Sequence, residues 1–382
     1  MKVYLDYNAG TPLAPRALAA MSESLSGMPG NPSSTHQFGR AARAQLDRAR
    51  EQVAALVGAH ASQALFTSGG TEANNLALHA VVAGLAPGRI AVSAIEHPSV
   101  LEAARALQKS GWQLDLIEAD SDGCITVQAL CRALKPDTRL VSVMMANNET
   151  GVIQPIAELA GCARGAGVLL HTDAAQAAGK IPVDFEACGA QLMTLSAHKL
   201  YGPKGAGALI VDKSVELEPM LYGGGQERGL RAGTENIPAI AGFGAAAELA
   251  AGMLEAEGLR QQALRDYLQA GLKRHPQVTV FAEQAQRLPN TLQFAIAGLD
   301  GEMLLMQLDK AGIAVSSGSA CASGKAEPSH VLLAMGVNPA LARGAVRVSL
   351  GRETTRQDID RLLTAVGEKL DWLNKASRAA GW

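Results

Sequence analysis

The sequence lacks several features that would assign it to particular classes of protein. Its five cysteines include no Cys-x-x-Cys pair and lack the regular spacing of disulfide-rich proteins, which favours free thiols over a disulfide scaffold or a structural zinc site. Its formal net charge is only -2, which argues against electrostatic binding of nucleic acid or of an anionic membrane. No apolar run reaches membrane-spanning length, and no signal-peptide segment follows Met1. We therefore expect a cytoplasmic protein with neither nucleic-acid nor membrane partners.

The rest of the chain reads as a globular α/β protein. Between about residues 64 and 212, β-rich runs alternate with helical patterns, which predicts a mostly parallel sheet covered by helices. We predict strands at 64–67, 89–94, 113–118, 140–145, 168–172, 192–195 and 208–211.

The second half of the chain predicts a smaller unit. A stretch rich in Ala, Leu and Glu from 237 to about 273 predicts one or two connecting helices. Beyond it, strands are predicted at 278–281, 291–295, 313–316 and 346–350, alternating with helices. We expect a large domain of residues 14–255. Residues 1–13 and 256–382 would form a small α+β domain that carries Cys321 and Arg347.

Asp173 and Lys199 follow two of the predicted strands. The run 167–173 reads as a buried strand that delivers Asp173 at its carboxyl end, and the run 191–196 delivers Lys199 in the same way. Ligands of open α/β sheets bind at such ends. A lysine can bind the aldehyde of pyridoxal phosphate, and a carboxylate can keep its pyridine nitrogen protonated. An Asp and a Lys at strand ends are usually structural, so the pair needs support from other residues.

Residues 66–75 combine a strand, a glycine-containing turn and a helix start. Backbone N–H groups there, together with the Thr71 hydroxyl, would suit a phosphate. The segment matches neither the Walker A motif nor G-x-G-x-x-G, which argues against mononucleotide and dinucleotide binding. An ordinary helix cap by Ser68 or Thr71 explains the pattern equally well.

Two further strand ends carry polar residues. His97 follows the second predicted strand, and an imidazole there can stack on a flat cofactor ring and exchange protons with a substrate. Asn148 follows the fourth strand and offers an amide for a ring hydroxyl or a carboxylate. Each residue alone could be an ordinary loop residue. Their position at neighbouring strand ends favours a common polar pocket.

Cys321 and Arg347 lie in the smaller unit. Cys321 stands in a loop of Ser, Gly and Ala that offers a structural cysteine nothing to pack against, which favours an accessible nucleophile. Arg347 alternates with apolar residues on a predicted strand, where its guanidinium suits a substrate carboxylate. An intramolecular ion pair is the alternative for Arg347.

Taken together, these segments resemble the cysteine desulfurases of the NifS/IscS type, class-V pyridoxal-phosphate enzymes of fold type I. The resemblance extends over nearly the whole chain. It is carried by residues 4–12, 30–34, 173–176, 196–199, 223–236, 316–321 and 328–332, together with the Thr71, Asn148 and Arg347 segments. Residues 231–236 resemble the NifS-like branch more than the IscS-like branch. Gly10 stands where relatives often have a second threonine.

The resemblance implies a role for each candidate residue. Lys199, His97 and Cys321 would be catalytic, and Arg347 with Asn148 would bind the substrate carboxylate. Thr234 would come from the other subunit of a homodimer. The implied residues for binding the cofactor, pyridoxal 5'-phosphate, are Gly70, Thr71, His97, Asn148, Asp173, Gln176, Ser196, His198, Lys199 and Thr234.

The activity implied is the conversion of L-cysteine to L-alanine. Sulfur would pass to Cys321 as a persulfide and then to an acceptor protein such as an iron–sulfur scaffold. No resident metal is implied, although the Cys321 thiol could ligate an iron–sulfur cluster transiently. Three alternatives are a selenocysteine lyase, another class-V aminotransferase and a non-catalytic scaffold of the sulfur machinery. Cys321 argues against the aminotransferase, and its presence together with Lys199 and Asp173 argues against the scaffold.

Overall fold

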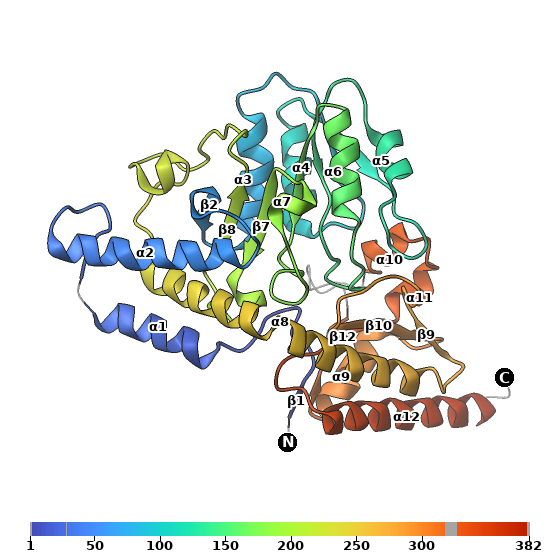
Figure 1. The fold of residues 1–382 in the computed structure, drawn as a ribbon. Coiled ribbons are helices and arrows are strands. Elements are labelled where there is room, and N and C mark those ends of the chain that lie inside the picture. Colours follow the sequence, from blue (N-terminus) through green and yellow to red (C-terminus); the bar gives the residue numbers. More distant parts are fainter. Residues whose placement is uncertain (1, 28, 318–326, 380–382) are drawn as a thin grey trace.

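A computed structural model describes residues 2–27, 29–317 and 327–379, with the side chains of 372–379 left out. A seven-stranded sheet forms its larger part, in the order β2-β8-β7-β6-β5-β3-β4 (Figure 1). Only β8 runs antiparallel to its neighbours. The strands are β2 (Ala64–Thr67), β3 (Arg89–Ser93), β4 (Gln113–Ile117), β5 (Thr138–Ser142), β6 (Leu169–Asp173), β7 (Leu192–Ser196) and β8 (Gly207–Val211). The mostly parallel sheet predicted from the sequence is confirmed.

Successive side chains along these strands point to opposite faces of the sheet, and each face has its own hydrophobic core. Leu65 and Leu192 pack with α3 (Gly70–Val82) and α4 (Pro98–Gln108) on one face. Their neighbours Phe66 and Met193 point to the other face. That second core also takes residues from α1 (Pro15–Ser26), α2 (Gln37–Ala55), α5 (Val127–Ala133), α6 (Ile156–Gly165) and α7 (Phe185–Cys188). Helices therefore cover both faces of the sheet, and the loops that connect strands to helices lie at its edges, where the strands end.

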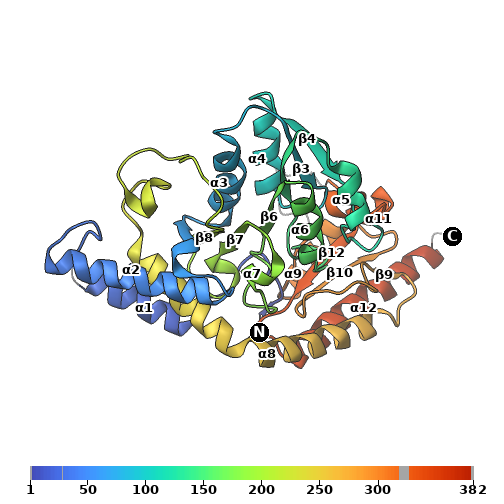
Figure 2. The ribbon, with the colours of Figure 1, turned by 45° about the horizontal axis from the view of Figure 1, so that its top comes forward.

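A single long helix, α8 (Ile237–Leu272), joins the two parts of the molecule. Its first half packs on α1 and α2, and Figure 2 shows it continuing beneath the smaller unit. By length and composition alone this helix could span a membrane. Residues such as Phe243 and Leu272 are nonetheless fully buried in the protein core, which accounts for its apolar character.

The smaller unit surrounds a second sheet. In it, β10 (Thr291–Ile296) lies antiparallel between β9 (Val278–Val280) and β12 (Ala345–Ser349). The helices α9 (Gly301–Lys310), α10 (His330–Ala334), α11 (Pro339–Arg343) and α12 (Arg356–Ala379) complete it.

The first residues of the chain belong to the smaller unit. β1 (Val3–Tyr4) pairs in parallel with β11 (Ile313–Ala314), and the side chains of Val3 and Leu5 enter its core. The following residues reach the edge of the large sheet, where the Thr11 N–H donates to the carbonyl of His198 at 3.0 Å. The N-terminal segment therefore connects both parts of the fold.

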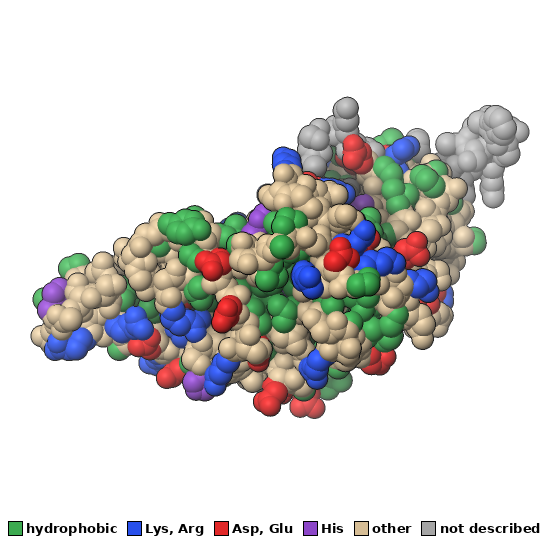
Figure 3. All heavy atoms as spheres, turned by 90° about the horizontal axis from the view of Figure 1, so that it is seen from above, with side chains coloured by type: hydrophobic (Ala, Val, Ile, Leu, Met, Phe, Trp, Pro, Cys, Tyr) green, Lys and Arg blue, Asp and Glu red, His purple; other side chains and the backbone are tan. Residues whose placement is uncertain are grey.

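Seen from above, one face of the molecule shows acidic and basic side chains interspersed (Figure 3). This distribution agrees with the small net charge of the chain.

Candidate active site

The carboxyl ends of the parallel strands surround one cavity of about 320 Å³. Its walls come from the β2–α3 turn, from the loops after β3, β5, β6 and β7, and from β12 and the N-terminal segment. The predicted site residues that line it are Gly70, Thr71, His97, Asn148, Asp173, Gln176, Ser196, His198, Lys199 and Arg347. The cavity lies at the strand ends because the carboxyl ends of parallel strands meet at one edge of the sheet.

Asp173 ends β6 and is nearly fully buried. Its Oδ2 accepts a hydrogen bond from Asn74 Nδ2 at 2.7 Å, and its Oδ1 accepts one from the N–H of Ala175 at 2.9 Å. Asn74 Nδ2 also donates to Ser99 Oγ at 2.8 Å. Sequence reasoning missed Asn74. The signal was its position four residues after Gly70, which places both on one face of α3.

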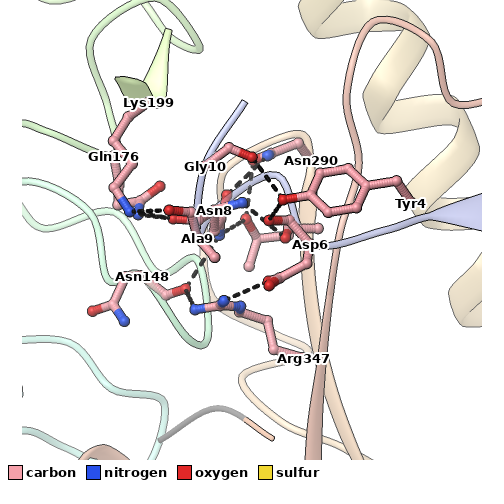
Figure 4. Close-up of polar contacts among 12 residues, drawn as sticks. Tyr4, Asp6, Asn8, Ala9, Gly10, Asn148, Gln176, Lys199, Asn290 and Arg347 are labelled. Atoms are coloured by element: carbon pink, nitrogen blue, oxygen red, sulfur yellow. Dashed lines mark hydrogen bonds and ion pairs between the residues drawn. The ribbon is translucent and has the colours of Figure 1, made fainter. Parts of the chain in front are cut away.

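Lys199 lies just after β7, in the short 3-10 turn η2 (Ala197–Lys199). Its Nζ donates to the carbonyl of Asn8 at 2.6 Å and to that of Ala9 at 3.1 Å (Figure 4). Burial, together with the charge of Arg347, lowers the pKa of this amine to about 8, although the charge of Asp173 opposes the shift. A lysine with such a pKa keeps a sizeable neutral, nucleophilic fraction near neutral pH.

Asn8 connects several parts of the site and was not singled out from the sequence. Its carbonyl accepts from Lys199 and also from Gln176 Nε2 at 3.0 Å. Its own Nδ2 donates to the carbonyl of Asn148 at 3.2 Å and to Thr291 Oγ1 at 2.9 Å. The only sequence signal was its place within the matching segment 4–12.

The start of α3 fits a phosphate. No side chain caps this helix, so the alternative of an ordinary cap by Ser68 or Thr71 does not hold. A Cβ at Gly70 would lie 3.3 Å from Ser196 Cβ, which means that glycine allows the helix start to approach β7 closely.

His198 adds an unsatisfied polar atom to the same region. Within the described part of the chain, its buried Nδ1 has no hydrogen-bond partner. Burial, together with the charges of Lys199 and Lys204, lowers the pKa of His198 to about 4, so its ring is neutral at physiological pH. A buried polar atom without a partner is costly, and a phosphate oxygen that accepts from an Nδ1–H would satisfy it. The residues present therefore fit the phosphate of the implied cofactor.

Arg347 on β12 is almost fully buried and faces the cavity. Its Nη2 forms an ion pair with Asp6 at 2.7 Å, and its Nη1 donates to the carbonyl of Asn148 at 3.0 Å (Figure 4). Its Nε has no partner among the described residues. The intramolecular ion pair considered from the sequence is present, and the guanidinium also keeps a free donor for a substrate carboxylate.

His97 caps α4 through its ring. Nδ1 accepts from the N–H of Ser99 at 3.1 Å and lies 2.8 Å from Ser99 Oγ. A backbone N–H can only donate, so the neutral ring carries its proton on Nε2. Burial lowers the pKa of His97, which favours this neutral form, while the charge of Asp173 opposes the shift.

The remaining predicted site residues are Thr234 and Cys321. Thr234 is exposed and does not reach the cavity. Cys321 lies outside the described residues. Within the described ranges, no group of three His, Cys, Asp or Glu side chains is arranged to hold a metal ion.

Comparison with known proteins places this geometry in a family. The sequence model of the class-V aminotransferases matches residues 3–362. A cysteine desulfurase from Cereibacter sphaeroides is 47% identical over 98% of this chain and 97% of its own. The cysteine desulfurase IscS of Dictyoglomus turgidum is 42% identical over 98% of this chain and 96% of its own. A solved NifS-like protein superposes with a TM-score of 0.91 at 36% identity, covering 97% of this chain and all of the other.

The chain therefore belongs to the class-V aminotransferases, enzymes that depend on pyridoxal phosphate. Within that class it is a member of the cysteine desulfurase family of the NifS/IscS type. The fold class predicted from the sequence, that of the fold-type I enzymes, is confirmed by the same structural match.

Proposed function

We propose that this protein is a cysteine desulfurase that converts L-cysteine to L-alanine and passes the sulfur on as a persulfide. The observation that carries the proposal is the single cavity that brings Lys199, Asp173 and Arg347 together. A reactive amine, a buried carboxylate and a guanidinium are the groups that a pyridoxal-phosphate enzyme needs to act on an amino acid.

Pyridoxal phosphate, when bound, supplies an electron sink for negative charge that develops at the substrate Cα. Asp173 would hold the pyridine nitrogen, with its orientation fixed by Asn74 and Ala175. Gln176 and Asn148 would lie near the ring hydroxyl. Gly70, Thr71, Ser196 and His198 would hold the phosphate, with Thr234 supplied by a partner subunit.

Lys199 binds the cofactor and moves a proton at the substrate Cα. Its lowered pKa suits both tasks, because the amine can gain or lose a proton near neutral pH. Arg347 fixes the substrate carboxylate through its free Nε, with Asn148 beside it. His97 would stack on the cofactor ring and exchange protons with the substrate. In its present orientation it donates from Nε2, and it accepts a proton only by releasing Ser99.

We assign the sulfur transfer to Cys321. Its thiolate would attack the substrate sulfur, forming an S–S bond as the substrate C–S bond breaks and its electron pair stays with the carbon. A proton then completes the methyl group of alanine. Cysteine is the side chain best suited to this attack, because its thiolate is strongly nucleophilic near neutral pH.

The proposal includes a cytoplasmic homodimer that delivers sulfur to an acceptor protein such as an iron–sulfur scaffold. Thr234 supports the dimer, because it is exposed and lies away from the cavity of its own chain. The division into a large domain of residues 14–255 and a small domain formed by the rest is part of the same proposal.

The first test follows absorbance in the pyridoxal-phosphate region as L-cysteine is added, with alanine and sulfide assayed in parallel in the presence of a dithiol reductant, which is oxidised as it releases the persulfide sulfur as sulfide. Wild type should release both products, and Cys321→Ala should bind L-cysteine but stall. Cys131→Ala, which removes an exposed thiol elsewhere, is the matched control. Normal turnover by Cys321→Ala would refute the role of that thiol. Faster turnover of L-selenocysteine than of L-cysteine would favour the lyase alternative.

A further inference from the structure

A second lysine lies directly beside the residues that hold Lys199. Lys180 comes seven residues after the end of β6. Its Nζ donates to Gln176 Oε1 at 2.6 Å and to Asn8 Oδ1 at 3.1 Å. The same two residues lead to Lys199, because Gln176 Nε2 and Lys199 Nζ both donate to the Asn8 carbonyl. Lys180 and Lys199 also line one small cavity.

These hydrogen bonds determine how both amides are turned. The carbonyls of Asn8 and Asn148 can only accept, so each amide turns its NH₂ group to a carbonyl and its oxygen to the Lys180 amine, which donates whether or not it is charged. The NH₂ group of Gln176 then faces the Asn8 carbonyl. The NH₂ group of Asn8 faces the carbonyl of Asn148, while Asn290 Nδ2 donates to Asn8 Oδ1 at 3.0 Å. Turning either amide over would place an NH₂ group against the donating Lys180 amine and remove a donor from these carbonyls.

We propose that Lys180 is a positioning residue of the cofactor site, which fixes the amides of Gln176 and Asn8 and, through them, the carbonyl that holds the Lys199 amine. This inference rests on the proposed function, because Gln176 and Lys199 act there on bound pyridoxal phosphate. Lys180 itself lies outside the cavity wall formed by those residues.

The groups around Lys180 indicate how replacement of this lysine would be detected. Lys199 from η2 and Arg347 from β12 face it, and burial together with these two charges lowers its pKa. Glu257 and Arg352 line the same small cavity as Lys180. Lys180 therefore acts as a hydrogen-bond donor rather than as a charge. The Asn8 carbonyl accepts from the Lys199 nitrogen and so stabilises a proton on it, and this stabilisation weakens when the carbonyl is no longer held in place. The pH midpoint of the absorbance band of lysine-bound cofactor should therefore fall.

The test uses holoenzyme without substrate. Lys180→Met is compared with wild type and with Lys109→Met, which removes an exposed lysine at the end of α4. In Lys180→Met we expect a lower pH midpoint and an affinity for pyridoxal phosphate weaker by about two- to tenfold, the effect of a lost hydrogen bond. Lys109→Met should match wild type. Values for Lys180→Met that equal those of the control overturn the inference.

A double-mutant cycle separates positioning from a general effect on stability. If Lys180 acts through Gln176, adding Lys180→Met to Gln176→Ala should change the midpoint and the affinity much less than it does alone. Fully additive effects would overturn the inference. If Lys180→Met does not fold, Lys180→Gln provides the same comparison. If the variants behave as expected but the protein makes no alanine, the proposed function is rejected and this inference stands. If the chain binds no pyridoxal phosphate, both are overturned.

Discussion

Replacing Glu96 by glutamine should remove a pH-dependent loss of stability. Glu96 is fully buried beside the site, where Oε1 accepts from Ser93 Oγ at 2.6 Å and from the N–H of Met144 at 2.5 Å. Its Oε2 has no partner in the described part of the chain. Burial, aided by the charge of Asp173, raises the pKa of Glu96 from 4.5 to about 8 despite those two hydrogen bonds.

The direction of the effect follows from where the proton is held. Between pH 4.5 and about 8 the folded protein keeps the Glu96 proton and the unfolded chain has released it. The free energy of unfolding therefore falls as pH rises through this window, by about 1.4 kcal/mol per pH unit. Over the whole window the loss is about 5 kcal/mol, and it is constant above pH 8. Glutamine keeps the acceptor oxygen and has no proton to release, so this loss should vanish.

Thermal unfolding midpoints at pH 5, 6, 7 and 8 provide the assay. The difference between Glu96→Gln and wild type should shift steadily in favour of the variant across this range. Glu51→Gln, which changes an exposed glutamate on α2, should follow wild type at every pH. Curves for Glu96→Gln and wild type that run parallel from pH 5 to pH 8 would refute the reasoning, because they would mean that Glu96 is ionised in the folded protein.

Three further outcomes are expected. In the apoprotein, modification of Lys199 by an amine reagent, followed by peptide mass spectrometry, should rise through about pH 8, and a midpoint near 10.5 would contradict the burial argument. Asn74→Ala removes the donor to Asp173 Oδ2 and should lower the free energy of unfolding by about 1–3 kcal/mol; an unchanged value would show that water replaces the amide. The thiols of Cys131 and Cys162 lie 3.0 Å apart, so hydrogen peroxide should convert them to a disulfide as it is reduced to water. Peptide mapping should detect the link, Cys131→Ser should prevent it, and its absence in wild type would indicate that α5 and α6 hold the two sulfurs in an unsuitable orientation.

The parallel sheet is predicted well from the sequence because each of its strands is a short apolar run that can be recognised from its own residues. The run predicted at 64–67 coincides with β2, and Asp173 lies at the end of β6 as expected. The stretch from 237 to about 273, predicted as one or two helices, forms the single helix α8. The run predicted at 313–316 extends beyond β11, because Ser316 pairs with Arg347 rather than continuing beside β1.

Residues that act through distant contacts could not be found in this way. Asn8 bonds residues between 140 and 341 positions away, and an asparagine in a polar segment carries no periodic pattern to reveal this. Asn74 and Lys180 are likewise defined by the amides and carboxylates that the fold brings to them. The domain boundaries and the roles of Thr234 and Cys321 stay predictions.

The N-terminal segment has a consequence for how the protein is made. β1 pairs with β11, so β1 must wait until β11 has been synthesised, and ribosomes add about 5–20 residues per second. The large sheet with Lys199 can form well before β11 emerges, roughly 15 to 60 s after β1. The carbonyls of Asn8 and Ala9 that hold the Lys199 amine should therefore reach it late in folding. A newly made chain would carry an unrestrained Lys199 until β11 has emerged, and the N-terminal segment would then hold the amine in place for the cofactor.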